Sequence, residues 1–222
     1  MRLQCQISSN TESVPFNYQH TLTRRLHSFF PDNDFHDDVS LYSFSWLHSK
    51  RQIQHQNSLD FPSGAEWFVN FLEERHIRSM LATIITSPTL FYGMTIEEVR
   101  IQETPQFPDS MRFFVASPVL VKKFDGKAIR HLTFNDPETN DVMTQTLQTK
   151  LRAAGLDAHA ESVRVRFDTS YAGAKTKLID IHGIKNRANA CPVIVEGTPE
   201  AVAFAWDVGV GHSTGAGFGA LR

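Results

Sequence analysis

Cysteine is scarce in this sequence, with Cys5 and Cys191 as its two examples. Their separation provides neither a Cys-x-x-Cys pair nor a disulfide framework, which favours a reducing compartment such as the cytoplasm. No apolar run is long enough to span a bilayer, and the first ten residues, MRLQCQISSN, lack the apolar core of a signal peptide. We therefore expect a cytoplasmic protein that makes no contact with a membrane.

An excess of charge is also missing. The chain has 22 Lys and Arg against 24 Asp and Glu, so its net charge is −2. This near-balance excludes a nonspecific nucleic-acid binder that depends on a global positive field, although a local basic groove remains compatible with it. The 222 residues, of which 41% are hydrophobic, predict one large globular domain or two of about 100 residues each.

Hydrophobic periodicity in the first half predicts alternating strands and helices. Leu22, Leu26 and Phe29 fall at i, i+4 and i+7, which is one face of a helix. Strands are expected over residues 1–8, 41–46, 65–71 and 95–101, and helices over 18–30 and 77–87. The resulting order, β-α-β-β-α-β, is that of the ferredoxin-like unit, which also underlies the RNA-recognition fold.

The same order returns after residues 103–110, a polar, proline-bearing linker. Thr198-Pro199 has the composition of a helix start, with Thr as N-cap. Strands are expected over 112–121, 162–167, 178–181, 191–197 and 218–222, and a helix is expected to stop at Gly155. The fold class is thus α+β with two tandem ferredoxin-like domains, 1–105 and 109–222, which repeat in element order but not in residues.

A glycine-rich segment, GVGHSTGAGFG, runs from Gly209 to Gly219. It is either a flexible terminus or backbone shaped for close approach to a ligand. Nucleotide fingerprints are absent, because Thr214 stands at the third glycine of G-x-G-x-x-G and no Lys-Ser/Thr follows. As a ligand site it would bind phosphate through turn amides and side-chain donors. The predicted RNA-binding residues here are Gly209, Gly211, His212, Ser213, Thr214, Gly215, Gly217 and Gly219.

This segment, at the end of a tandem ferredoxin-like chain, resembles the glycine-rich loop of the repeat-associated RNA-binding (RAMP) superfamily. More closely, it resembles that of the CRISPR-associated endoribonucleases that cut repeat transcripts into guide RNAs. VPFNYQHTLTRRL is similar to the P-x-N-x-Q entry to the first helix of that family. The resemblance implies cleavage of CRISPR repeat RNA without metal or cofactor. The expected products carry a 5′-hydroxyl and a 2′,3′-cyclic phosphate.

Cleavage by the RNA's own 2′-hydroxyl requires a base, an acid and a cation for the phosphorane. Histidine suits the first two roles because both of its protonation states are available near neutrality. By the resemblance, His27 and His36 fall at catalytic positions, and we assign His27 as base and His36 as acid, with the reverse left open. The stretch after His36 is acidic, so the cation is expected from Arg24 or Lys50, with Arg25 and Arg51 as further options.

Two other interpretations of these residues remain. The polar side chains of the first helix could be a solvated face, and His36-Asp37-Asp38 could ligate a metal, although no second ligand cluster accompanies them. We therefore expect no metal.

Basic residues concentrate in the second half, where several clusters in one domain predict a groove that follows phosphates. The predicted RNA-binding members are Lys122, Lys123, Arg164, Arg166, Lys185 and Arg187. An RNP1-like aromatic signature is absent, so residues 41–46 and 65–71 are expected to be core strands. Expected partners are CRISPR repeat RNA and proteins of a CRISPR effector complex, with the chain as monomer or homodimer. The alternatives are a noncatalytic guide-RNA-binding subunit and a metabolite-binding regulatory protein.

Overall fold

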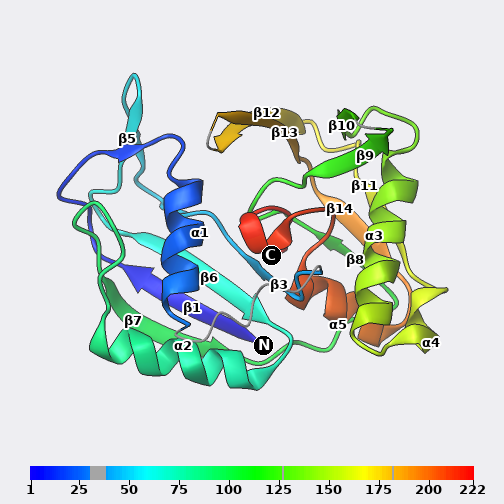
Figure 1. The fold of residues 1–222 in the computed structure, drawn as a ribbon, viewed down its shortest axis with the longest axis horizontal. Helices are drawn as coiled ribbons and strands as arrows, with labels where there is room; N and C mark the ends of the chain where they lie inside the picture. Colours follow the sequence, from blue (N-terminus) through cyan, green and yellow to red (C-terminus); the bar gives the residue numbers. More distant parts are fainter. Residues whose placement is uncertain (31–38, 127, 182) are drawn as a thin grey trace.

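The computed structural model describes residues 1–30, 39–126, 128–181 and 183–222. Figure 1 shows two α+β units side by side, with the C-terminal segment turning back between them. Both are ferredoxin-like, as the sequence predicts. In the described chain, no helix has the length and apolar character needed to cross a membrane.

The first unit is a four-stranded antiparallel sheet with two helices. Its strand order is β3-β6-β1-β7. The elements are β1 (Arg2–Ile7), α1 (Gln19–Ser28), β3 (Tyr42–Phe44), β6 (Ala65–Phe71), α2 (Glu74–Thr86) and β7 (Ile96–Gln102). Alternation along β1 buries Leu3, Cys5 and Ile7 in one core with the apolar stripes of both helices. A smaller sheet, β2 (Val14–Pro15), β4 (Ile53–Gln54) and β5 (Ser58–Asp60), lies beside it.

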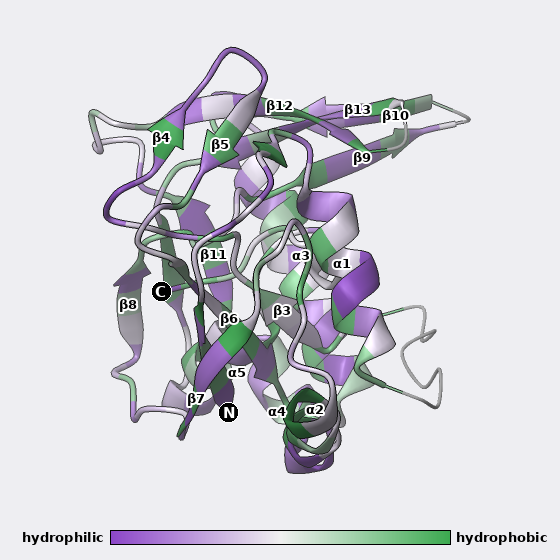
Figure 2. Cartoon of the chain, turned by 90° about the vertical axis from the view of Figure 1, so that its left-hand side faces the viewer, coloured by the Kyte–Doolittle hydropathy of each residue, from purple (hydrophilic) through white to green (hydrophobic). Residues whose placement is uncertain are grey.

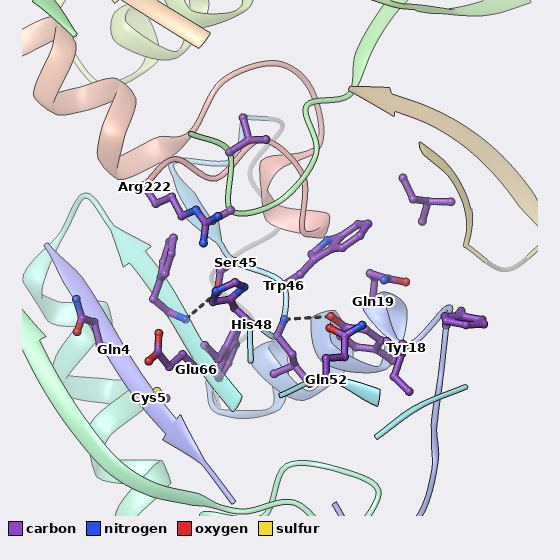
Figure 3. Close-up of a pocket in the computed structure, with 18 of the residues that line it drawn as sticks. Gln4, Cys5, Tyr18, Gln19, Ser45, Trp46, His48, Gln52, Glu66 and Arg222 are labelled. Atoms are coloured by element: carbon purple, nitrogen blue, oxygen red, sulfur yellow. Dashed lines mark hydrogen bonds between the residues drawn. The ribbon is translucent and has the colours of Figure 1, made fainter. Parts of the chain in front are cut away.

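Helices α1 and α2 cover one side of the four-stranded sheet. Its other side, which carries Gln4 and Glu66, is not covered by them. It borders a cleft with a volume of about 930 Å³, which Figure 3 shows in close-up. Trp46 and Arg222 also border the cleft, so its wall includes both units. The cleft therefore lies along the junction of the two domains.

The second unit has a related element order around a three-stranded sheet, and the last strand expected over 218–222 is reduced to an isolated bridge of Leu221 with Val115. Its elements are β8 (Ser110–Phe113), α3 (Thr139–Ala153), α4 (Asp157–Ala160), β11 (Arg164–Phe167), β14 (Val193–Glu196), α5 (Pro199–Val208) and the 3-10 turn η1 (Thr214–Ala216). The strand order is β11-β14-β8. The chain end completes the edge, because the amides of Phe114 and Arg222 donate to each other's carbonyls at 3.0 and 2.8 Å. As expected, Thr198 caps α5 by accepting from the Ala201 amide.

Two hairpins are inserted in this second unit. They are β9 (Val121–Asp125) with β10 (Ala128–Leu132), and β12 (Lys175–Ile181) with β13 (Ile184–Ala190). For the strand expected over 112–121, Pro118 predicts an edge or a bulge. In the structure β8 ends at Phe113, isolated bridges follow at Val115, Val119 and Leu120, and β9 begins at Val121. The hairpins lie next to each other at one end of the molecule (Figure 2).

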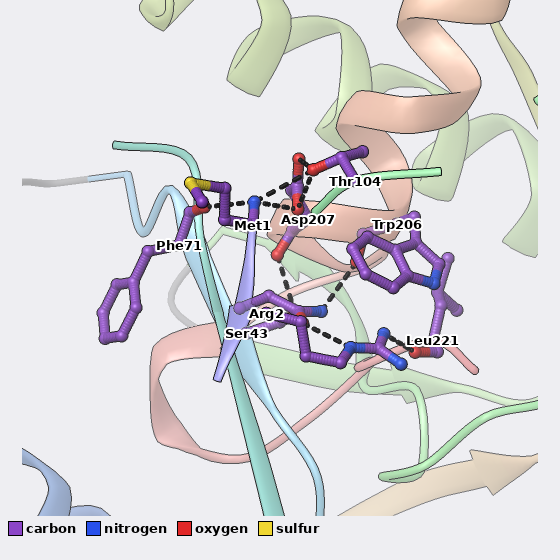
Figure 4. Close-up of polar contacts among 9 residues, drawn as sticks. Met1, Arg2, Ser43, Phe71, Thr104, Trp206, Asp207 and Leu221 are labelled. Carbon is purple, nitrogen blue, oxygen red and sulfur yellow. Dashed lines mark hydrogen bonds and ion pairs between the residues drawn. The ribbon is translucent and has the colours of Figure 1, made fainter. Parts of the chain in front are cut away.

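A buried polar cluster joins the two domains (Figure 4). The Arg2 guanidinium lies between the rings of Phe68 and Trp206, 3.8 Å from each centroid, and donates to Asn70 Oδ1 at 2.7 Å. It also donates to the Leu221 carbonyl at 2.7 Å. Burial lowers the pKa of Arg2 to about 9, and the nearby carboxylate of Asp207 opposes this shift.

Asn70 connects this cluster to α5. Its amide donates to the Trp206 carbonyl at 2.8 Å and to Ser43 Oγ at 3.2 Å. Ser43 Oγ in turn donates to the Asp207 carbonyl at 3.0 Å. Strands β3 and β6 of the first domain therefore bind the last turn of the second domain's helix, α5, whose orphan carbonyls need such donors.

Replacing Asn70 by Ala should destabilise the protein by about 2–4 kcal/mol, because Arg2 Nε and the Trp206 carbonyl would stay buried without this partner. Urea unfolding followed by circular dichroism measures the loss. The matched control is Gln4→Ala on the neighbouring strand, an exposed site where a change within about 0.5 kcal/mol is expected. Equal effects of the two substitutions would contradict the role given to Asn70.

Candidate functional site

The glycine segment, residues 209–219, is an ordered part of the domain junction. It is buried except for His212, Ser213 and Ala216, which are half-buried, so it is not a flexible terminus. Gly209, Gly211, Gly217 and Gly219 have φ of +71°, +76°, +84° and +66°. Glycine adopts this left-handed region without a steric penalty, which explains its repeated use here.

Close packing also requires these glycines. A Cβ on Gly219 would overlap the Val210 carbonyl oxygen, and one on Gly217 would come within 3.0 Å of the Phe44 ring. The amides of Gly209, Gly217 and Gly219 donate to carbonyls of the protein at 2.9, 3.2 and 3.0 Å. Of the eight residues predicted to bind RNA here, those with side chains at the surface are His212 and Ser213.

His27, the predicted base, lies against this segment. Its Nε2 is 2.9 Å from the Tyr42 hydroxyl, which donates to the Gly215 carbonyl at 3.2 Å. Burial raises the pKa of Tyr42, which keeps the phenol protonated. The fold thus connects the first helix to the glycine segment through one tyrosine.

The sequence analysis missed Tyr42 and treated residues 41–46 only as a core strand. Trp46, from the same stretch, donates from Nε1 to the Gly217 carbonyl at 2.8 Å. The available signal was the residue type, because a buried Tyr or Trp usually places its polar atom against a partner. Both side chains bind carbonyls of the glycine segment.

The other predicted catalytic residues are only partly brought together. Arg24 is exposed on α1, one turn before His27. Lys50 is exposed and borders a small hollow beside Glu66. His36 lies outside the described residues.

The register of β3 on β6 separates Lys50 from His27. Tyr42, which contacts His27, pairs with Phe71, whereas His48 bridges Glu66 at the other end of the ladder. Six residues of extended chain span roughly 20 Å, and Lys50 lies beyond His48. The structure therefore brings Arg24 near His27 and leaves Lys50 at the opposite end of the strand.

A buried lysine lies beneath the glycine segment. Lys150 Nζ donates to Thr214 Oγ1 at 2.8 Å and to the Val208 carbonyl at 3.1 Å. Burial lowers the pKa of Lys150 to about 7. The sequence analysis did not single it out, although it stands seven residues after Met143, on the apolar stripe of its helix.

His212 is neutral at pH 7 because burial, followed by the charges of Lys122 and Lys150, lowers its pKa to about 4. Its Nδ1 accepts from the Lys122 amide at 3.2 Å, and its own amide donates to the Leu120 carbonyl at 2.7 Å. With Nδ1 accepting, the neutral ring carries its proton on Nε2, so it can serve as a hydrogen-bond donor.

Ion pairs divide the predicted RNA-binding cations into two groups. Lys123 pairs with Glu138, and Arg166 pairs with Glu196 at 3.4 Å. Arg164 donates to the backbone carbonyls of Glu161 and Val163. In the described parts of the chain, Lys122, Lys185 and Arg187 form no ion pair with a carboxylate, and Lys122 Nζ instead donates to Ser213 Oγ at 3.1 Å.

The interdomain cleft has a mixed polar and aromatic lining. Gln4 and Glu66 from the sheet face Trp46 and His48, and Lys177 from β12 lies over the Trp46 ring at 5.0 Å from its centroid. Burial lowers the pKa of Lys177. Amides, an indole and a cation together suit an unpaired polynucleotide better than a small apolar ligand.

A metal cluster is not formed by the described residues, in which no three His, Cys, Asp or Glu side chains gather closely enough. His36, Asp37 and Asp38 lie outside them.

The chain therefore consists of two ferredoxin-like domains with a buried glycine segment packed at their junction. The family described as CRISPR associated protein Cas6, C-terminal, matches residues 102–222, more than half of the chain. This chain belongs to that family of CRISPR-associated proteins. No curated protein sequence matches it.

Solved structures share the fold at low identity. A Cas6-related protein of Pyrococcus furiosus is 16% identical with a TM-score of 0.85, covering 100% of this chain and 97% of that one. A RAMP protein described as binding different RNA substrates is 17% identical with a TM-score of 0.84, covering 100% and 98%. Thermus thermophilus Cas6 is 14% identical with a TM-score of 0.60, covering 100% and 97%.

Gly219→Ala should destabilise the protein by more than about 3 kcal/mol, because left-handed strain adds to overlap with a backbone oxygen that cannot rotate away. The matched control is Gly155→Ala, which has a similar φ of +73° and no atom within 4 Å of the new Cβ. It should cost only about 1–2 kcal/mol. Urea unfolding of both variants tests the packing, and equal losses would show that conformation alone requires the glycine.

Proposed function

We propose that this protein is a metal-independent endoribonuclease that cuts CRISPR repeat transcripts into guide RNAs. Membership of the Cas6 family supports the broader role in repeat-RNA processing. The observation that carries the proposal is the contact chain from His27 through Tyr42 to Gly215, which joins the predicted base to the glycine segment.

In the proposed reaction, His27 removes the proton of the RNA 2′-hydroxyl, whose oxygen attacks the adjacent phosphorus. The bond to the 5′-oxygen breaks, which leaves a 2′,3′-cyclic phosphate and, after protonation, a 5′-hydroxyl. In the tautomer that carries its proton on Nε2, Nδ1 is the basic nitrogen of His27. Arg24, one turn away, is the proposed cation for the phosphorane, and His36 is the proposed acid by resemblance to the family.

Two surfaces are proposed to hold the RNA. The first combines Lys122 and Arg187, two of the three cations without carboxylate partners, with the half-buried His212 and Ser213. The second is the interdomain cleft, for an unpaired part of the repeat. The solved relative described as binding different RNA substrates supports an RNA ligand for this architecture.

A noncatalytic guide-RNA-binding subunit of a CRISPR effector complex is the second candidate. The position of Lys50, beyond the end of β3 and away from His27, favours it, since one predicted source of the stabilising cation is then missing. The two candidates differ in whether bound RNA is cut.

His27→Ala should lower the cleavage rate of a repeat RNA by at least ~10²-fold in EDTA while leaving its affinity within about twofold, because general acid–base groups contribute in this range. His36→Ala should behave alike. The wild-type protein should cut the all-ribose RNA and leave intact a copy that lacks the 2′-hydroxyl at the cut position. Gel-based single-turnover assays and filter binding measure both quantities.

The matched control is His20→Ala, an imidazole on the same helix away from the Tyr42 contact, which should retain cleavage. Equal loss of binding and cutting in His27→Ala would identify a structural residue. Wild-type binding without any cutting would favour the noncatalytic subunit.

Lys122→Gln should weaken RNA binding and reduce the slope of log K against log salt by about 0.7–0.9, which corresponds to the loss of one phosphate contact. Glutamine keeps a donor for Ser213, so the change removes mainly charge. Lys123→Gln, the next residue, should alter neither quantity much because Glu138 already pairs with that lysine. Binding of uncleavable RNA across salt concentrations tests this, and identical slopes for both variants would contradict it.

A further inference from the structure

One face of the β9–β10 hairpin combines exposed apolar and basic side chains. Phe124 pairs with Ile129, and Lys122 pairs with His131. Alternate residues of a strand share a face, so all four side chains lie together. Phe124 is 64% exposed and Ile129 is 54% exposed. An exposed phenylalanine at this position is not explained by the core of either domain.

Phe124 stands at the edge of the glycine segment. Its ring centroid is 6.4 Å from that of His212, at an interplanar angle of 61°. His212 is held by the Leu120 carbonyl and the Lys122 amide, so it is a fixed wall beside an exposed ring. The aromatic pair is therefore continuous with the surface part of the glycine segment.

Cations surround this aromatic pair. Lys122 lies on the same face as Phe124, and the Arg187 amide donates to His131 Nδ1 at 3.4 Å across the two hairpins. Both charges lie near His131 and lower its pKa, after burial, which is the larger cause. By contrast, Lys123 and Arg130, on the opposite face of the same hairpin, both pair with Glu138.

A second group of exposed aromatic residues has a different environment. Phe114 and Tyr171 contact each other at 5.7 Å, and the Arg112 guanidinium lies over the Phe114 ring at 4.6 Å. Arg112 is itself paired with Asp168 at 2.6 Å. In that group the aromatic rings already contact each other, and the charge of Arg112 is already paired with a carboxylate. Among the described residues, the one ring contact of Phe124 is with His212, and Lys122 on the same face has no carboxylate partner.

We propose that Phe124 and His212 form a stacking position for one unpaired nucleobase of bound RNA, with Lys122 and Arg187 holding the flanking phosphates. An aromatic ring offers a face to any base, and neighbouring cations follow the backbone, which is the usual arrangement of single-strand binding surfaces. The neutral His212 adds a hydrogen-bond donor at the base edge. The inference rests on the proposed function for the identity of the RNA, not for the stacking itself.

The test uses repeat RNA blocked at the cut position, with 2-aminopurine substituted at one position at a time. Wild-type protein should quench one position strongly through stacking. Phe124→Leu, which keeps an apolar side chain but removes the ring, should abolish that quenching and weaken binding about 10-fold. Phe124→Trp should retain both.

Ile129→Ala is the control for apolar contact on the same face, and Phe114→Leu is the control for an exposed aromatic elsewhere; both should bind within about twofold of wild type. Wild-type affinity in Phe124→Leu would overturn the proposal. Equal losses in Phe124→Leu and Ile129→Ala would also overturn it, in favour of an apolar docking surface for a protein.

Cleavage of unblocked RNA separates this inference from the proposed function. If the wild-type protein stacks a base through Phe124 but does not cut the RNA, the result supports the inference and contradicts the proposed endoribonuclease function. If the wild-type protein cuts the RNA and the Phe124→Leu variant matches it in quenching and affinity, the result contradicts only the inference.

Discussion

The packing of the glycine segment against strand β3 is the constraint on which the site depends. The Tyr42 hydroxyl and the Trp46 indole each donate to a carbonyl of that segment, at 3.2 and 2.8 Å. These donors can reach the carbonyls only because the residues opposite them are glycines, whose missing side chains leave room for the Phe44 and Tyr42 rings. The same contacts align the first helix with the end of the chain, so the predicted base and the predicted binding segment share one location.

Burial around this junction also sets its charges. Lys150, beneath the segment, and Lys122, beside it, add to burial in lowering the pKa of His212 to about 4, which makes that ring a neutral donor. His27 lies on the other domain's helix and contacts a phenol that burial keeps protonated. The two imidazoles therefore lie in different surroundings, one against the glycine segment and one within it.

Much of the fold could be predicted because hydrophobic period depends on local geometry. The alternation of Leu3, Cys5 and Ile7 and the stripe of Leu22 and Leu26 correspond to the observed β1 and α1. The strand expected over 112–121 is interrupted around Pro118, which predicts an edge or a bulge because it cannot donate to a ladder. Lys150 was missed because its partner, Thr214, is distant in the chain. Without that partner in view, a lysine within an apolar stripe is treated as a break in the pattern.

Local patterns were sufficient to predict the main β-α-β-β-α-β order and to reveal the unusual glycine spacing, since each depends on neighbours a few residues apart. Which cations keep an unneutralised charge, which histidine touches the glycine segment, and where Lys50 lies all depend on contacts between residues far apart in the chain. Such contacts arise from sheet register and from the docking of two domains, neither of which leaves a periodic signal in the sequence. Tertiary structure alone decided them.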